Sequence, residues 1–231
     1  MKFIPKKPAL LVDDILVVAD LHNGIEYELH KKGVEVPSQT QAKFESLKEI
    51  VEQTKPKRLI ILGDLKHNIP ITSRQEYHEV PEFLEGMQSY VDEIIITKGN
   101  HDGAIEKLVP PGVSVVSEFI EKKTGFFHGH TSPSDEILST KSIVKAHTHP
   151  SILLKDIRPY IQPAWVEVPL KERKCRVTVV PAFDDNIRGI ALNISEPLGP
   201  LLTKMADMPE AEIYLLDGSY IGKLGELKEE V

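Results

Sequence analysis

Five short segments of the chain place metal-binding side chains directly after an apolar run that is typical of a β-strand. They cover residues 15–22, 59–64, 94–102, 126–130 and 143–149. The end of a strand is a rigid support for a ligand, and the ends of neighbouring strands meet at one crevice. The pattern therefore predicts a site that holds more than one divalent metal.

The candidate ligands combine carboxylate, amide and imidazole groups. They are Asp20, His22, Asp64, Asn100, His128, His147 and His149. Mixed oxygen and nitrogen ligation suits manganese, iron or zinc better than calcium or a metal that prefers thiolates. The one cysteine, Cys175, lies outside these segments. We expect two divalent metal ions as cofactors, with manganese as the first choice and iron, zinc or nickel as alternatives.

The residues after Asn100 indicate how such a metal pair would be used. Two metals about 3.5–4 Å apart clamp a phosphoryl group and lower the pKa of a bridging water to near neutrality. The resulting hydroxide would attack phosphorus in line, and the departing oxygen would need a proton. We predict that His101 supplies this proton and that Asp102 orients or polarises His101, so these two residues are the candidate catalytic pair.

The ordered motifs Asp-x-His, Gly-Asp, Gly-Asn-His-Asp, His and His-x-His resemble those of the calcineurin-like metallophosphoesterases. Gly-Asp-Leu-Lys-His at 63–67, Phe-His-Gly-His at 127–130 and Pro-Ala-Phe at 181–183 are most similar to a small SbcD-related branch. That branch occurs in archaea and among bacterial ligase-associated phosphoesterases. Each motif is weak alone, but five in this order are specific. One departure is Ala146, where the family usually has glycine before His-x-His.

The resemblance implies an α/β fold, a two-sheet β-sandwich flanked by helices on both faces in α/β/β/α layers. It also implies a division of the ligands between two metals. The first metal would be bound by Asp20, His22, Asp64 and His149, and the second by Asp64, Asn100, His128 and His147. His101 would be the general acid or would stabilise the transition state.

The hydrophobic pattern predicts one domain over residues 1–231, with the metal motifs in 20–149 and a strand-rich second-sheet region in 150–225. Strands are expected at 15–19, 58–62, 93–97, 113–116, 118–121, 125–128, 143–147, 151–154, 164–168, 175–180, 190–194, 212–216 and 219–222. Helices are expected at 24–31, 38–54 and 134–138. A further helix is expected to begin at the capping box of residues 73–76, to restart at Pro81 and to end near Tyr90. Residues 181–189 and 195–210 are predicted loops, and 228–231 a solvated tail.

Charge and cysteine content limit the class of protein further. The chain has 28 basic and 35 acidic residues, a net charge of −7, which argues against non-specific clamping on a long nucleic-acid duplex. A single cysteine permits no intrachain disulfide, which favours a reducing, cytoplasmic compartment. Asp13 and Asp14 interrupt the first apolar stretch, so we expect no signal peptide, and without a long apolar run we expect no membrane span.

Several functions fit these residues. We favour hydrolysis of phosphodiesters, with nucleotides or nucleic-acid ends as the phosphate ester substrate, mainly because of the SbcD-related motifs. A phosphomonoesterase or protein phosphatase often carries arginines that grip the dianion, and none is evident near the motifs. An amidohydrolase is disfavoured because His147-x-His149 comes fifth rather than early. A non-catalytic metal-binding scaffold in a DNA-repair complex, and a homodimer formed through the last third, stay open.

Four further residues have two interpretations each. His67 is evenly balanced between the rim of the site and an ordinary loop. We favour His130 as the orienting partner of a ligating imidazole over a substrate-pocket role. For Arg158 and Arg188 we favour the surface over contact with a substrate phosphate.

Overall fold

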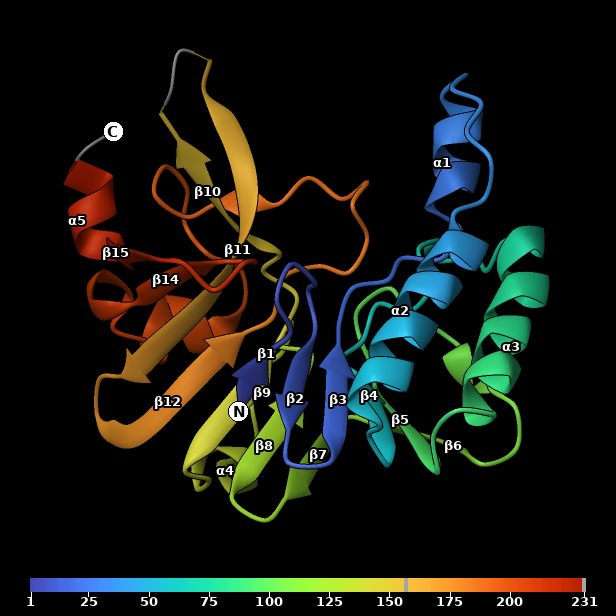
Figure 1. Cartoon of the computed structure of the whole chain (residues 1–231), viewed down its shortest axis with the longest axis horizontal. Helices are drawn as coiled ribbons and strands as arrows, with labels where there is room; N and C mark the ends of the chain where they lie inside the picture. The colour runs from blue at the N-terminus through green and yellow to red at the C-terminus, as the bar shows by residue number, and fades with distance from the viewer. Residues whose placement is uncertain (156–157, 230–231) are drawn as a thin grey trace.

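The first half of the chain builds a six-stranded sheet in the computed structural model, which describes residues 1–155 and 158–229 (Figure 1). Its strands, in spatial order, are β1 (Lys2–Phe3), β2 (Leu10–Val12), β3 (Ile15–Val18), β4 (Arg58–Ile61), β5 (Glu93–Thr97) and β6 (Val113–Val116). The last four strands are parallel and aligned, with Val18 opposite Ile61 and Ile61 opposite Ile96. Their carboxyl ends therefore reach the same edge.

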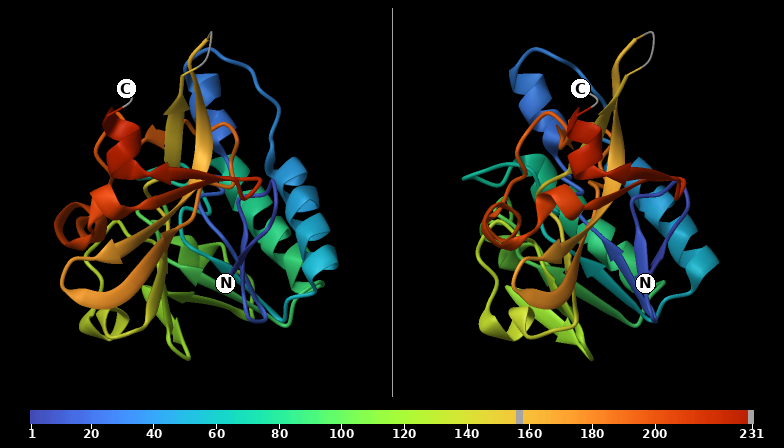
Figure 2. Two further views of the ribbon diagram at one scale, coloured as in Figure 1. Left: turned by 60° about the vertical axis from the view of Figure 1, so that its left-hand side comes forward. Right: turned by 90° about the vertical axis from the view of Figure 1, so that its left-hand side faces the viewer.

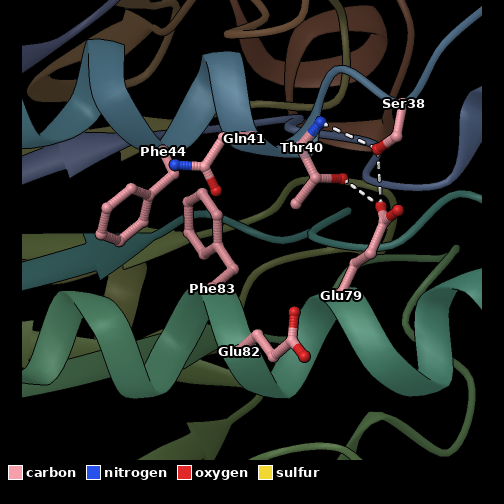
Figure 3. Close-up of a pocket in the computed structure, with 7 residues that line it drawn as sticks. All are labelled: Ser38, Thr40, Gln41, Phe44, Glu79, Glu82 and Phe83. Atoms are coloured by element: carbon pink, nitrogen blue, oxygen red, sulfur yellow. Dashed lines mark hydrogen bonds between the residues drawn. The ribbon is translucent and has the colours of Figure 1, made fainter.

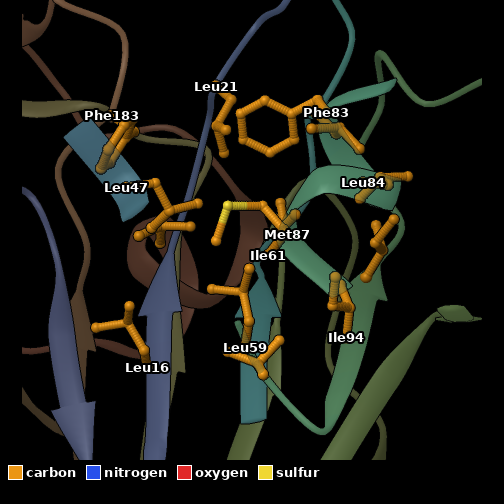
Figure 4. Close-up of a cluster of buried hydrophobic side chains, with 14 of the residues drawn as sticks. Leu16, Leu21, Leu47, Leu59, Ile61, Phe83, Leu84, Met87, Ile94 and Phe183 are labelled. Atoms are coloured by element: carbon orange, nitrogen blue, oxygen red, sulfur yellow. The ribbon is translucent and has the colours of Figure 1, made fainter. Parts of the chain in front are cut away.

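Two long helices cover the outer face of this sheet. They are α2 (Thr40–Thr54) and α3 (Arg74–Gln88). Their apolar stripes meet alternate residues of the strands, as Leu47, Met87 and Ile61 illustrate in the cluster of Figure 4. Burying such a side chain contributes about 1.5–3 kcal/mol, so this layer fixes the strands that carry the first motifs.

The second half forms a nine-stranded mixed sheet. Its strands are β7 (Glu118–Glu121), β8 (Thr124–Phe127), β9 (Ser142–Lys145), β10 (Pro150–Leu154), β11 (Tyr160–Leu170), β12 (Arg173–Val179), β13 (Ile190–Ala191), β14 (Glu212–Leu215) and β15 (Tyr220–Lys223). The main path runs β13-β10-β11-β12-β9-β8-β7, with β14 on β11 and β15 on β14. Strands β8 and β9 are parallel neighbours, so their ends also lie side by side.

A third apolar cluster lies between the two sheets and joins them. It combines Leu10, Val17 and Ile60 of the first sheet with Phe126, Val144 and Trp165 of the second. The ring of Trp165 stacks on Phe3, with 4.4 Å between the ring centroids. Figures 1 and 2 show α2 and α3 on one side of the molecule and the C-terminal elements on the other. The predicted α/β sandwich with helices on both faces is therefore confirmed.

The structure corrects the helix predictions in two places. Helix α3 continues through Pro81, because Val80, Phe83 and Leu84 on either side of the proline are buried in the first core. Residues 195–210 are not all loop. They include a π-helix (Leu201–Met205) and a 3-10 helix (Met208–Glu210), whose apolar residues pack on the second sheet.

The smaller elements show further differences. Helix α5 (Leu224–Glu229) includes Lys228, which was predicted to lie in a solvated tail, while residues 230–231 of that tail lie outside the described residues. Strand β1 was not predicted, and β13 is shorter than the expected 190–194. Helices α1 (Ile25–Lys31) and α4 (Asp135–Leu138) and the 3-10 helix Ile105–Lys107 complete the fold. Within the described ranges, no helix is long and apolar enough to cross a bilayer.

Candidate metal centre

The predicted ligands follow five strands that end at one edge of the sandwich. Asp20 and His22 follow β3, Asp64 follows β4 and Asn100 follows β5 in the first sheet. From the second sheet, His128 follows β8, and His147 and His149 follow β9. The structure brings all seven together, which is the convergence that the sequence predicts. Their role as metal ligands stays a prediction, because the structure shows their geometry alone.

The first group consists of Asp20, His22, Asp64 and His149. One potential ligand atom from each of these residues lies within 4.8 Å of those of the others. The Nε2 atom of His149 is 3.3 Å from Oδ1 of Asp20, and Nε2 of His22 is 3.8 Å from Oδ2 of Asp64. All four side chains thus face a common point.

The second group consists of Asp64, His128 and His147, whose ligand atoms also lie within 4.8 Å of one another. The Nε2 atom of His128 is 3.3 Å from Oδ2 of Asp64 and 3.2 Å from Oδ1 of Asn100. Asp64 belongs to both groups. A carboxylate with two oxygens in this position is able to bridge two cations.

The backbone at the strand ends is strained. Five of the seven predicted ligands have a positive φ, which side chains other than glycine rarely adopt. These are Asp20 at 54°, His22 at 46°, Asp64 at 50°, His147 at 69° and His149 at 45°. Such conformations persist where the surrounding structure enforces them, and they gather at functional sites. The left-handed turns direct side chains from different strands toward one hollow.

Two glycines make room for this arrangement. A Cβ atom on Gly99 would lie 2.2 Å from Oδ1 of Asp64, and one on Gly63 would lie 2.5 Å from Nδ1 of His128. Neither distance is compatible with a side chain. Both the Gly-Asp and the Gly-Asn-His-Asp motif therefore need their glycine for close approach, and Gly63, at a φ of 74°, is needed for the turn as well.

Burial and mutual attraction set the charges of the site. Burial lowers the pKa of His22 to about 3 and that of His147 to about 4, so both imidazoles are neutral at pH 7. Burial also disfavours the charged form of His128, but the carboxylates of Asp64 and Asp20 outweigh it and raise the pKa of His128 to about 9. Burial opposes ionisation of Asp20 and Asp64 too, yet neighbouring histidines lower the pKa of both.

The donor set fits divalent cations. Among the described residues, Oδ1 of Asp20, Nε2 of His22 and Nε2 of His149 are buried without a hydrogen-bond partner. Leaving buried polar atoms unpaired costs about 1–3 kcal/mol each, so their convergence on one point needs a compensating group. A cation bound there would satisfy all three atoms. Metals bind neutral imidazoles and ionised carboxylates, so a proton held by His128, whose pKa is raised, would be released on binding.

Asp102 does not have the predicted contact with His101. Its buried carboxylate instead accepts hydrogen bonds from backbone amides, at 2.8 Å from Asp64, 2.9 Å from Gly99 and 3.0 Å from Leu65. The backbone carbonyl of His67 takes the expected place and accepts from Nδ1 of His101. The side chain of Asp102 thus holds the loop after β4 and the loop after β5 together. Its oxygens accept from these backbone amides rather than from His101.

His67 and His130 both lie at the site, with different surroundings. His67 belongs to the rim rather than to an ordinary loop, since its Nδ1 is 3.2 Å from Nδ1 of His22. The ring of His130 is 5.3 Å from that of His128, but its Nδ1 has no hydrogen-bond partner within the described part of the chain. The carbonyl of Leu62, 2.7 Å from Nδ1, orients His128 instead. The orienting role predicted for His130 is therefore wrong.

A buried ion pair behind the site was not anticipated. The Nζ atom of Lys43 on α2 donates to Oδ2 of Asp184 at 2.6 Å and to the carbonyl of Leu21 at 2.7 Å. Leu21 lies between the ligands Asp20 and His22. Lys43 thus supports the first ligand loop from the helix side, and 141 residues separate it from Asp184.

Two cavities differ in their relation to the ligands. One of about 250 Å³ is lined by His149, Asp185 and Arg188, so an exposed arginine does lie beside the motifs, contrary to the sequence-based expectation. Another, of about 280 Å³, lies between α2 and α3 and has none of the predicted ligands in its lining (Figure 3). Glu79 there accepts from Ser38 and Thr40, which joins the start of α2 to α3.

Comparison with known proteins agrees with this architecture. A family model described as calcineurin-like phosphoesterase matches residues 14–191, so the chain belongs to that family. The nuclease MPE of Pseudomonas putida is similar with a TM-score of 0.60 and 19% identity, over 90% of this chain and 88% of that chain. The phosphoesterase Yfce of E. coli has a TM-score of 0.46 and 15% identity, over 90% and 97%. A search of curated proteins found no match.

Family membership defines the class of protein as a phosphoester hydrolase of a family that binds divalent metals. The structural likeness to the Pseudomonas putida protein shows the shared fold, at an identity too low to transfer a substrate.

Proposed function

We propose that this protein is a dinuclear metal-dependent phosphoesterase that hydrolyses phosphodiesters of nucleotide or nucleic-acid type. The observation that carries the proposal is the presence of two ligand groups that share Asp64. A shared carboxylate brings two cations to the separation at which one phosphoryl group contacts both. Manganese is the metal that we favour.

The chain's own residues have distinct tasks in this proposal. Asp20, His22, Asp64 and His149 would hold one cation, and Asp64, Asn100, His128 and His147 the other. Divalent metals bound there supply positive charge beside a phosphoryl group and lower the pKa of water. These ligands come from rigid strand ends, so the two charges would be fixed before the substrate binds.

His101 is the residue that we propose as general acid. Its backbone amide donates to Oδ1 of Asp64 at 2.8 Å, and its Nδ1 lies against the carbonyl of His67. A carbonyl accepts only, so Nδ1 carries hydrogen, and as general acid the ring acts as an imidazolium whose Nε2–H passes its proton to the leaving oxygen. Proton transfer by a positioned side chain contributes roughly 100-fold to 10,000-fold to a rate.

The preference for diesters rests on two kinds of support. The motifs at 63–67 and 127–130 resemble the SbcD-related branch, and the solved protein from Pseudomonas putida is described as a nuclease. Arg188 beside His149 favours a second candidate, a phosphomonoesterase, because an arginine is able to grip a phosphate dianion. The cytoplasmic location and a homodimer stay predictions.

Turnover of model esters tests the proposal. We expect a higher kcat/KM for bis-p-nitrophenyl phosphate than for p-nitrophenyl phosphate with added Mn²⁺, whereas a clear preference for the monoester would end the diester assignment. His101→Ala should lower turnover at least 100-fold while the bound metal, measured by elemental analysis, stays the same. His78→Ala, on the outer helix α3, is the control and should keep full activity.

A further inference from the structure

His67 lies between two imidazoles of the site and connects them to a carboxylate from another element. Its Nδ1 is 3.2 Å from Nδ1 of His22, and its Nε2 is 2.6 Å from Oε2 of Glu28 on helix α1. Its ring also stacks on that of His101, with 5.3 Å between centroids. Glu28, His67 and His22 therefore form a continuous chain of hydrogen-bonding groups that ends at a predicted ligand.

The direction of each hydrogen bond follows from the chemistry of the groups. Lys32 and His67 hold the pKa of Glu28 at about 2, so its carboxylate only accepts at neutral pH. Nε2 of His67 must then donate, and with its one hydrogen placed there the ring offers Nδ1 as an acceptor. At 3.2 Å, the Nδ1 atom of His22 is its donor.

This direction determines which nitrogen of His22 is available. A neutral imidazole carries one hydrogen, so a hydrogen on Nδ1 leaves a lone pair on Nε2. Nε2 is the buried atom without a hydrogen-bond partner among the described residues, and it lies 3.8 Å from Oδ2 of Asp64. Partners of this kind fix the tautomer and ring orientation of ligating histidines.

The position of His67 is itself fixed from the opposite side. The fully buried carboxylate of Glu76 accepts from the backbone amides of His67 at 2.9 Å and Asn68 at 2.6 Å. Glu76 is also the N3 residue of the capping box that begins α3. The loop after β4 therefore holds the imidazole in place independently of Glu28.

We propose that Glu28 and His67 are positioning residues that select the Nδ1–H tautomer of His22 and so present its Nε2 lone pair to the first metal. The inference rests on the proposed function, in that His22 is taken as a ligand of that metal.

The same atoms offer an alternative, the binding of a third cation, because ligand atoms of His22, His67 and His101 lie within 4.8 Å of one another. A cation on Nδ1 of His22 would displace its hydrogen, so the two arrangements exclude each other.

Metal titration of the full-length protein tests the proposal. Calorimetry with Mn²⁺ should show two binding steps in the wild type, one of which is weakened roughly 10-fold by Glu28→Ala and up to roughly 100-fold by His67→Ala. The other step and the urea midpoint of the metal-free protein should not change. Lys32→Ala is the matched control, because Lys32 bonds the other oxygen of Glu28, and it should keep both steps.

Nitrogen-15 NMR of the histidines in the metal-free protein shows which ring nitrogen carries hydrogen, and it does not depend on enzymatic activity. We expect His22 with hydrogen on Nδ1 in the wild type and in Lys32→Ala, and a shift toward Nε2–H in Glu28→Ala. An Nε2–H tautomer in the wild type, or equal effects of Glu28→Ala and Lys32→Ala, would overturn the proposal. A third equivalent of Mn²⁺ that disappears in His67→Ala would also overturn it.

The two proposals fail in different ways. If the wild type bound no Mn²⁺, the proposed function would be wrong, while a tautomer change in Glu28→Ala would still support the hydrogen-bond chain. If Mn²⁺ bound in two steps that ignored Glu28 and His67, the metal site would stand and the positioning role would be wrong.

Discussion

Replacing Asp102 by asparagine separates a structural role from the catalytic one that the sequence suggests. The carboxylate accepts four backbone amides, at 2.8 Å and 2.9 Å on Oδ2 from Asp64 and Gly99, and at 3.0 Å and 3.4 Å on Oδ1 from Leu65 and Lys66. Asparagine has one oxygen, so its best orientation keeps the two shorter bonds. Its NH₂ group would then face two other donors.

The size of the effect follows from these distances. Asparagine would leave the amides of Leu65 and Lys66 without an acceptor, and each buried amide in that state costs about 1–3 kcal/mol. The 3.4 Å contact of Lys66 is the weaker of the two, so their combined loss is about 2–4 kcal/mol. Burial and the nearby Asp64 carboxylate raise the pKa of Asp102, so removal of its charge offsets part of that loss. We therefore expect Asp102→Asn to lower the free energy of unfolding by about 2 kcal/mol.

Urea unfolding of the metal-free protein, followed by circular dichroism, measures this loss. Glu106→Gln is the control, because Glu106 is an exposed acid that pairs with Lys98 on the surface, and it should change stability by less than about 0.5 kcal/mol. A loss below about 0.5 kcal/mol for Asp102→Asn would refute the loop-tying role. A fall in kcat with unchanged stability would restore the orienting role on His101.

Three further outcomes are expected. Removal of metal with a chelator should lower Tm by roughly 5–10 °C for each ion lost, relative to protein with Mn²⁺ at 100 times its Kd, because each such ion adds about 2.7 kcal/mol, and an unchanged Tm would argue against a metal site. Asp184→Ala should destabilise the protein by about 3–5 kcal/mol in urea, since it leaves the Lys43 charge buried, whereas the neighbouring exposed Asp185→Ala should have little effect. Gly99→Ala should weaken Mn²⁺ binding at least roughly 10-fold in calorimetry, because its Cβ would meet Asp64, while Gly103→Ala, with open space around it, should bind normally.

The convergence of the candidate ligands at strand ends could be predicted because the position of each depends on a local signal. An apolar run of four or five residues predicts a buried strand, and the polar residue after it lies at the strand's end. Parallel neighbours then bring those ends together, as β3, β4 and β5 do. The position of each polar residue after an apolar run therefore predicted which residues would converge.

The supporting contacts could not be predicted in this way. Glu28 meets His67 across 39 residues, and Lys43 meets Asp184 across 141 residues, so neither pair leaves a periodic trace in the sequence. The local rule that proline stops a helix was wrong at Pro81, because burial of the surrounding apolar face outweighs one lost hydrogen bond. The role of Asp102 depends on amides of another loop, which the Gly-Asn-His-Asp motif does not reveal.

The left-handed backbone of the ligands has a consequence for engineering this protein. Each such residue stores about 1–3 kcal/mol of strain, so five of them together hold an amount comparable to the net stability of a domain. A screen that rewards only heat resistance would favour glycine at these positions, since glycine adopts a positive φ freely. Thermostable variants selected without metal would thus gain robustness by dismantling the proposed metal centre.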